Sequence, residues 1–371
     1  MSPNNDQTLL DRLAESPDDP NLREDVEEAL LKNPAPAFHR ALDLLFYQSR
    51  PKQPVQLEFS SDQKAALTTR RAGSRRRDGY VIRINSGFYN LLSDVTEISV
   101  GWSEVLSKTG DLLMGPSFTV DKLLEILKEA IAQYVSEKNQ WVPRNELKQS
   151  NRQRLLEEYR LTSRHRRSAI HYGRRQFMIL FAIGHELGHI LKRHCDPPGM
   201  FSRHRSTRQE ELEADRVAAR QLIEYLKIPP LWRVNPVPPT HDGTELFLYS
   251  LKLQEMHNRY FNWYGPHDQY PASPYHIGLV NALIAIAMLF IIYDLTERAA
   301  LELQIDKKHD YPPASERYAS FRETCVNDLE VSEESFTEFV YGVSAPDEVF
   351  RMFGKLTKDV SWASENGLTT G

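Results

Sequence analysis

The chain has 371 residues, 40% of them hydrophobic and 26% charged, and its formal net charge is −5. This length allows one large domain or two ordinary ones, each with a sizeable buried core. The two cysteines, Cys195 and Cys325, lie far apart in the sequence, which excludes a disulfide framework and a metal cluster made of cysteine alone. The acidic N-terminus lacks the basic, apolar and small-residue order of a secretory signal, so we expect a reducing, cytoplasmic location.

The first 60 residues are predicted to form a helical accessory segment. Two stretches in it have apolar residues at three- and four-residue spacings, LREDVEEALLK and PAFHRALDLLFYQSR. In the next stretch, residues 80–92, apolar and polar residues alternate before a turn at Ser86 and Gly87, which predicts a strand around residues 81–84 that leads into a helix. We expect this strand to form a small twisted sheet with VTEISVGW, residues 95–102, followed by amphipathic helices at 118–140 and 155–172.

Basic residues are concentrated in two places, 70–77 and 152–175, although the net charge is negative. An anionic partner, a nucleic acid or an acidic substrate could dock on these clusters. The alternative is a solvated basic surface, since no sequence motif of a nucleic-acid-binding fold accompanies them. The second cluster leads directly into the next predicted helix and could steer an acidic substrate towards it.

The helix predicted over residues 174–193 contains the sequence HELGH. His185 and His189 are one helical turn apart and point the same way, so both can reach one zinc ion at about 2.0–2.1 Å. Glu186 follows the first histidine, where a carboxylate can take a proton from the water that the metal activates. This is the H-E-x-x-H arrangement of zinc metallopeptidases. His194 and Cys195 lie beyond the metal-facing turn and are expected to be packing residues.

A second helix is predicted over residues 207–226, in TRQEELEADRVAARQLIEYL. A catalytic zinc ion takes three protein ligands and keeps one position for water, so a third ligand is needed. Glu211 and Asp215 share one face of this helix. Glu211 can therefore bind the zinc ion while Asp215 accepts a hydrogen bond from a ligand imidazole, which we expect to be His185. The alternative is a solvated helix start, where acids are favoured by the helix dipole.

A long irregular segment and an apolar helix follow. Residues 226–274 are rich in proline and aromatic residues and are predicted to form an insertion that sets substrate specificity. Residues 277–293 are almost wholly apolar and lie at the short limit for a membrane span, which needs roughly 20 such residues. Gly278 and Asn281 interrupt this stretch and no cationic anchor precedes it, so a buried core helix is favoured over a membrane helix.

HELGH followed by EELEAD resembles the gluzincin clan of metallopeptidases, and residues 78–320 resemble most the phage-exclusion Lit-type peptidases. The resemblance implies an α+β, zincin-like fold, mostly helical with a small sheet. We expect the peptidase domain to span residues 61–325 and a helical extension to span 326–371. The resemblance also implies a zinc-dependent endopeptidase that cuts a protein substrate, in anti-phage defence. The zinc ligands would be His185, His189 and Glu211, with Glu186 as the base and Asp215 behind a ligand histidine.

One position departs from the pattern of these relatives, which often carry a histidine before a proline pair and an arginine a few residues later. Here Tyr311 precedes the proline pair and Arg317 follows it. The group that stabilises the oxyanion is therefore open among Tyr311, Arg317, His309 and His276, and we favour Tyr311. A proline-stiffened turn, with Arg317 paired to a structural carboxylate, is the alternative.

Two other functions compete with a soluble peptidase. A zincin-like chain that no longer cleaves could serve as a binding or regulatory module, although such a module has no chemical need of Glu186. A membrane-associated peptidase could use residues 277–293 as its anchor. In the favoured hypothesis, the active-site cleft lies between a sheet edge and the zinc-binding helix, where an extended peptide can add as a strand.

Overall fold

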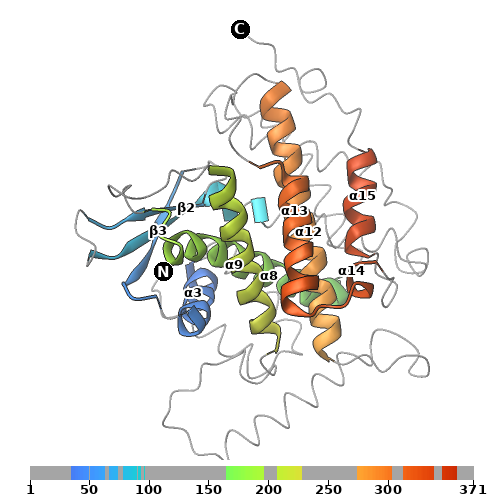
Figure 1. Ribbon diagram of the computed structural model, residues 1–371, viewed down its shortest axis with the longest axis horizontal. Coiled ribbons are helices and arrows are strands. Elements are labelled where there is room, and N and C mark those ends of the chain that lie inside the picture. The colour runs from blue at the N-terminus through green and yellow to red at the C-terminus, as the bar shows by residue number, and fades with distance from the viewer. Residues whose placement is uncertain are drawn as a thin grey trace, which may run out of the picture.

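The computed structural model describes residues 35–49, 51–62, 67–73, 78–89, 91–92, 96, 164–195, 207–227, 274–302, 312–337 and 345–356. Within these residues the protein is mostly helical and has one three-stranded sheet, so the prediction of an α+β chain with a small sheet is confirmed. Figure 1 shows the sheet and α3 (Ala35–Ser49) on one side of two crossing helices, α8 (Arg164–Leu191) and α9 (Thr207–Lys227). On the other side stand α12 (Pro274–Glu302), α13 (Ala314–Glu323), α14 (Glu334–Thr337) and α15 (Pro346–Leu356).

The sheet has the strand order β1-β3-β2, with β1 (Val55–Ser60) parallel and β2 (Leu67–Arg71) antiparallel to the central β3 (Tyr80–Asn85). The predicted strand at 81–84 is thus confirmed as β3, whose side chains are all buried except that of Arg83. Of the second predicted strand, 95–102, only Thr96 is described, and it is helical. β2 alternates half-buried and exposed residues and forms an edge of the described sheet.

The two helices predicted over 174–193 and 207–226 are present as α8 and α9, and small residues let them cross closely. A Cβ atom on Gly188 would lie 2.8 Å from Ala214 Cα, and one on Gly184 would lie 3.2 Å from Ala218 Cα. The first distance is shorter than real Cβ contacts, so only glycine fits there without a shift of backbone. The close crossing brings the start of α9 next to the HELGH turn of α8.

The apolar helix predicted at 277–293 is the middle of α12. By length and composition it could cross a membrane, yet 78% of its Gly278–Leu295 window is buried inside the protein. It packs against α8, α9, α13 and α15, and its Phe290 meets Phe181 and Phe321 with ring centroids 5.6 and 6.1 Å away. A helix that is apolar all round is covered all round, and α12 is the central helix of the described core.

Segments predicted as accessory contribute to the same core. α3 packs on α8, and β1 pairs with β3 across the domain boundary predicted at residue 60. At the other end, Phe350 of α15 stacks on Tyr318 of α13, with ring centroids 4.4 Å apart. The boundaries themselves stay predictions. The helices predicted at 22–32 and 118–140, nearly all of the insertion at 226–274, and residues 74–77 and 152–163 of the basic clusters lie outside the described residues.

Candidate metal centre

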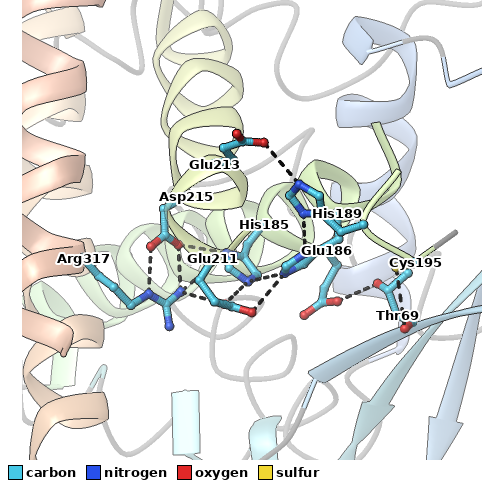
Figure 2. A network of polar contacts seen from close by, with 10 residues as sticks. Thr69, His185, Glu186, His189, Cys195, Glu211, Glu213, Asp215 and Arg317 are labelled. Atoms are coloured by element: carbon cyan, nitrogen blue, oxygen red, sulfur yellow. Dashed lines mark hydrogen bonds and ion pairs between the residues drawn. The ribbon is translucent and has the colours of Figure 1, made fainter. Parts of the chain in front are cut away.

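Three side chains from α8 and α9 converge on one point (Figure 2). The Nε2 atoms of His185 and His189 are 3.1 Å apart. The Glu211 carboxylate lies beside both rings, with Oε2 3.2 Å from Nε2 of His185 and Oε1 3.5 Å from Nε2 of His189. The candidate ligand atoms all lie within 4.8 Å of one another, so this group could hold a metal ion.

The hydrogen bonds of these side chains leave lone pairs directed at the space between them, where a cation can bind. Nδ1 of His185 lies 2.8 Å from Asp215 Oδ1 and must donate to it, because an ionised carboxylate only accepts. In the neutral imidazole, Nε2 of His185 then carries a lone pair that faces His189 and Glu211. Oε2 of Glu211 is buried and makes no hydrogen bond within the described part of the chain, although it lies 3.2 Å from His185 Nε2. A set of two imidazole nitrogens and one carboxylate fits a divalent metal ion.

The pKa values of the candidate ligands also indicate that one positive charge is stabilised among these side chains. Burial disfavours the charged form of His185, but the neighbouring carboxylates of Asp215 and Glu211 outweigh it and raise its pKa to about 10. Burial, together with the charge of His185, lowers the pKa of His189 to about 3. Burial opposes ionisation of Glu211, yet the contacts with His185 and Arg317 lower its pKa to about 2. The cluster thus accommodates one positive charge close to the two histidines, which a metal ion can supply in place of the proton.

Behind His185, Asp215 forms a buried ion pair with Arg317 of α13. Nε and Nη2 of Arg317 each donate to one oxygen of Asp215 over 2.8 Å. Burial opposes the charge of Asp215, but Arg317 and His185 outweigh it and lower its pKa to about 2. Arg317 Nη2 also lies 3.9 Å from Glu211 Oε2, and the guanidinium packs over the rings of Phe290 and Tyr293, 5.5 Å from each centroid. This arrangement holds Asp215 ionised as the acceptor for His185.

Glu186 lies on the opposite side of the histidines, next to the sheet (Figure 2). Oγ1 of Thr69, in the edge strand β2, donates to Glu186 Oε2 over 2.6 Å. No cationic side chain forms an ion pair with Glu186 among the described residues. Burial raises its pKa to about 7, although the hydrogen bond from Thr69 and the charge of His185 act in the other direction. A carboxyl group with a pKa near neutrality can both accept and return a proton.

His189 has a second partner that the sequence analysis did not predict. Its Nδ1 lies 2.9 Å from Nδ1 of His194, whose Nε2 lies 3.2 Å from Glu213 Oε2. The only signal in the sequence is the spacing of five residues between two histidines at a helix C-terminus, where a turn can fold the chain back. Cys195, which follows, places its Sγ 3.9 Å from the carbonyl oxygen of Thr69.

The structure brings together the residues predicted for the site on α8, α9 and α13, namely His185, Glu186, His189, Glu211, Asp215 and Arg317. Tyr311 and His309 lie outside the described residues, and so does the side chain of His276 in the first turn of α12. Three further neighbours of the site were not predicted: Thr69, Glu213 and Tyr293.

Compared with models of protein families, with curated proteins and with solved structures, the chain gives no match. The resemblance to gluzincins and to Lit-type peptidases therefore stays a prediction that depends on the HELGH and EELEAD motifs.

Proposed function

We propose that the chain is a zinc-dependent endopeptidase of zincin-like fold that hydrolyses a peptide bond of a protein substrate. The observation that carries the proposal is the convergence of Glu211 with the two imidazoles while Glu186 lies beside them. Two histidines and one carboxylate are a ligand set of catalytic zinc sites, which keep a fourth position for water or substrate. The resemblance adds a role in anti-phage defence to the proposal, and the composition adds a cytoplasmic location.

When bound, a zinc ion lowers the pKa of a water molecule and polarises the scissile carbonyl. Glu186, whose pKa in the metal-free protein is raised to about 7 by burial, would accept the proton of this water and pass it to the leaving amine. Thr69 orients the Glu186 carboxylate through its hydroxyl group. Asp215 and Arg317 keep His185 in the tautomer whose Nε2 is free to bind metal.

Arg317 acts here as a positioning residue, since Nε and Nη2 are both used on Asp215. Tyr311 remains the residue that we propose for stabilising the oxyanion. Tyr293 is a second candidate, because its ring packs on Arg317 and its pKa is raised by burial, which keeps the phenol protonated as a donor. Replacing each tyrosine by phenylalanine and comparing kcat with zinc content distinguishes the two.

The substrate is proposed to bind as an extended peptide along β2. β2 is an edge of the described sheet, and edge strands can pair with an added strand through main-chain hydrogen bonds. Thr69 lies in the middle of this strand and contacts Glu186, so a peptide on this edge would pass beside the base. The anchoring alternative has less support, because most of the apolar window of α12 is covered by the protein.

The test uses the purified chain with one equivalent of zinc. Glu186→Gln is expected to retain zinc by elemental analysis and to lose cleavage, whereas His189→Ala is expected to lose both. Cleavage is followed by labelling new N-termini in cells that express the wild-type chain or the Glu186→Gln variant. If the two cell populations show the same N-termini while both proteins hold zinc, the binding-module hypothesis is correct and the peptidase proposal is wrong.

A further inference from the structure

The turn that ends α8 carries the second partner of His189. We propose that His194 and Glu213 are positioning residues that fix the metal-binding tautomer and the ring orientation of His189. This inference rests on the proposed metal site, and it adds a second hydrogen-bond chain to that of Asp215 and Arg317.

The direction of the protons follows from the acceptor at the end of the chain. An ionised Glu213 carboxylate only accepts, so Nε2 of His194 carries the proton in the 3.2 Å contact. Nδ1 of a neutral His194 is then an acceptor, and the 2.9 Å contact requires Nδ1 of His189 to donate. Nε2 of His189 is left with its lone pair, and this atom faces His185 and Glu211. The chain of contacts therefore selects the tautomer that binds metal.

The backbone after α8 is folded so that His194 returns to His189. The amide N–H of His194 donates to the carbonyl oxygen of His189 over 2.9 Å, and that of Arg193 donates to Ile190 over 3.1 Å. These two bonds form a Schellman turn, in which the residue before the last adopts a left-handed conformation. Arg193 has this conformation, with φ of 65°, although glycine is the residue that adopts it without strain.

Burial protects the hydrogen bonds of His194 from competition by water. The His194 side chain is 4% exposed and that of Glu213 is 17% exposed, so water has little access to compete for the ring nitrogens. The rings of His189 and His194 meet edge to face, at 70° and with centroids 5.1 Å apart. Glu213 comes from α9, two residues after Glu211, so one helix supplies both a metal ligand and the end of this hydrogen-bond chain.

The test is the zinc affinity of the full chain, measured by competition with a chromophoric chelator. His194→Leu is expected to weaken zinc binding by about 10–100-fold, the usual effect of removing the partner of a ligand histidine. His194→Asn keeps an acceptor for Nδ1 of His189 and should retain affinity within a few-fold. His39→Leu, at an exposed histidine of α3, serves as the matched control and should leave affinity unchanged.

A spectroscopic readout separates positioning from a general loss of structure. In the zinc-free protein, a long-range ¹H–¹⁵N correlation spectrum should show the His189 proton on Nδ1 in the wild type and in His194→Asn, and a larger share of the Nε2 tautomer in His194→Leu. Should His194→Leu fail to fold, Glu213→Ala decides the question instead, with an expected loss of several-fold in affinity.

The outcomes of the two proposals are distinguishable. If the wild type binds no zinc, or if His189→Ala binds it as well as the wild type, the proposed metal site is wrong. If the wild type binds one zinc ion and loses it in His189→Ala, but folded His194→Leu and Glu213→Ala match the wild type, only the positioning role of His194 and Glu213 is overturned.

Discussion

Two buried carboxylates on opposite sides of the candidate metal centre have opposite environments. Asp215 faces Arg317 in a two-point ion pair, and its pKa is lowered to about 2. Glu186 accepts a hydrogen bond from the hydroxyl group of Thr69 and forms no ion pair among the described residues, and burial raises its pKa to about 7. Neighbouring acids whose pKa values are pushed apart by their surroundings take different roles in a site. Asp215, paired with Arg317, is a fixed negative charge. Glu186, next to the sheet, is a carboxyl group that can gain or lose a proton.

The largest expected effect comes from neutralising the fixed charge. Asp215→Asn leaves Arg317 buried without its anion and should lower the free energy of unfolding by about 3–5 kcal/mol at pH 7. The folded-state pKa of Asp215, about 2, lies below the ordinary 3.8, so the contribution is present above pH 3.8 and is lost as the pH falls towards 2. Urea titrations with chelator present measure it.

The control for Asp215→Asn is Asp328→Asn, which breaks an exposed ion pair with Arg220. Such exposed pairs contribute about 0–1 kcal/mol, so this variant should unfold almost as the wild type does. Equal losses in the two variants would contradict the assignment of Asp215 as the buried structural charge.

Neutralising Glu186 should act in the opposite direction. Its folded-state pKa of about 7 lies above the ordinary 4.5, so the metal-free wild type loses stability as the pH rises from 4.5 to 7. Glu186→Gln should therefore be more stable above pH 7, by on the order of 2–3 kcal/mol, and equal to the wild type below pH 4.5. Chelator-treated protein is unfolded by urea at several pH values, with Glu224→Gln, at an exposed position of α9, as the control.

Removing the hydroxyl group that donates to Glu186 should widen the difference between the pKa values of Glu186 and Asp215. The hydrogen bond from Thr69 lowers the pKa of Glu186, so Thr69→Val should raise it by roughly one unit. A ¹³C NMR titration of the Glu186 carboxyl group measures the shift, and the acidic limb of the cleavage rate should move with it. Thr68→Val changes the neighbour on the exposed face of β2 and should leave the titration unmoved; a matching shift there would exclude the specific role of Thr69.

The smallest expected effect concerns the turn that ends α8. Arg193 adopts a left-handed conformation, so Arg193→Gly should raise the free energy of unfolding by about 0.5–1 kcal/mol while keeping the turn. Glu330→Gly, at the other described non-glycine residue with positive φ, should give a similar gain. Thermal unfolding of the two variants is the measurement. A loss of zinc affinity in Arg193→Gly would indicate that the arginine side chain itself supports the site.

Much of the candidate site could be predicted from the sequence because its residues are spaced by one helical turn. His185 and His189 are four residues apart on α8, as are Glu211 and Asp215 on α9, and helical periodicity alone places each pair on one face. The contact of Asp215 with His185 was predicted on this basis, and it is present at 2.8 Å. The core role of the 277–293 helix followed from its apolar composition.

The rest of the site comes from contacts that no local spacing encodes. Thr69 lies 117 residues from Glu186 in the sequence, and no pattern in the basic stretch around it points to a partner on α8. His194 was expected to be a packing residue, because its return to His189 depends on a left-handed turn at Arg193, a residue type that rarely adopts one. Tyr293 ends an apolar run that is typical of a core helix, so its place beside the site was not predicted.

The sequence by itself determined two helices, the face of each that carries the candidate ligands, and a third, apolar helix, because these properties arise from the order of residues along one segment. Only the tertiary structure decided that the two faces meet, since this depends on Gly184 and Gly188 letting Ala214 and Ala218 come close. It also decided the environments of the two carboxylates. Arg317, 102 residues from Asp215 in the sequence, pairs with Asp215 and lowers its pKa, whereas burial raises the pKa of Glu186, which forms no ion pair among the described residues.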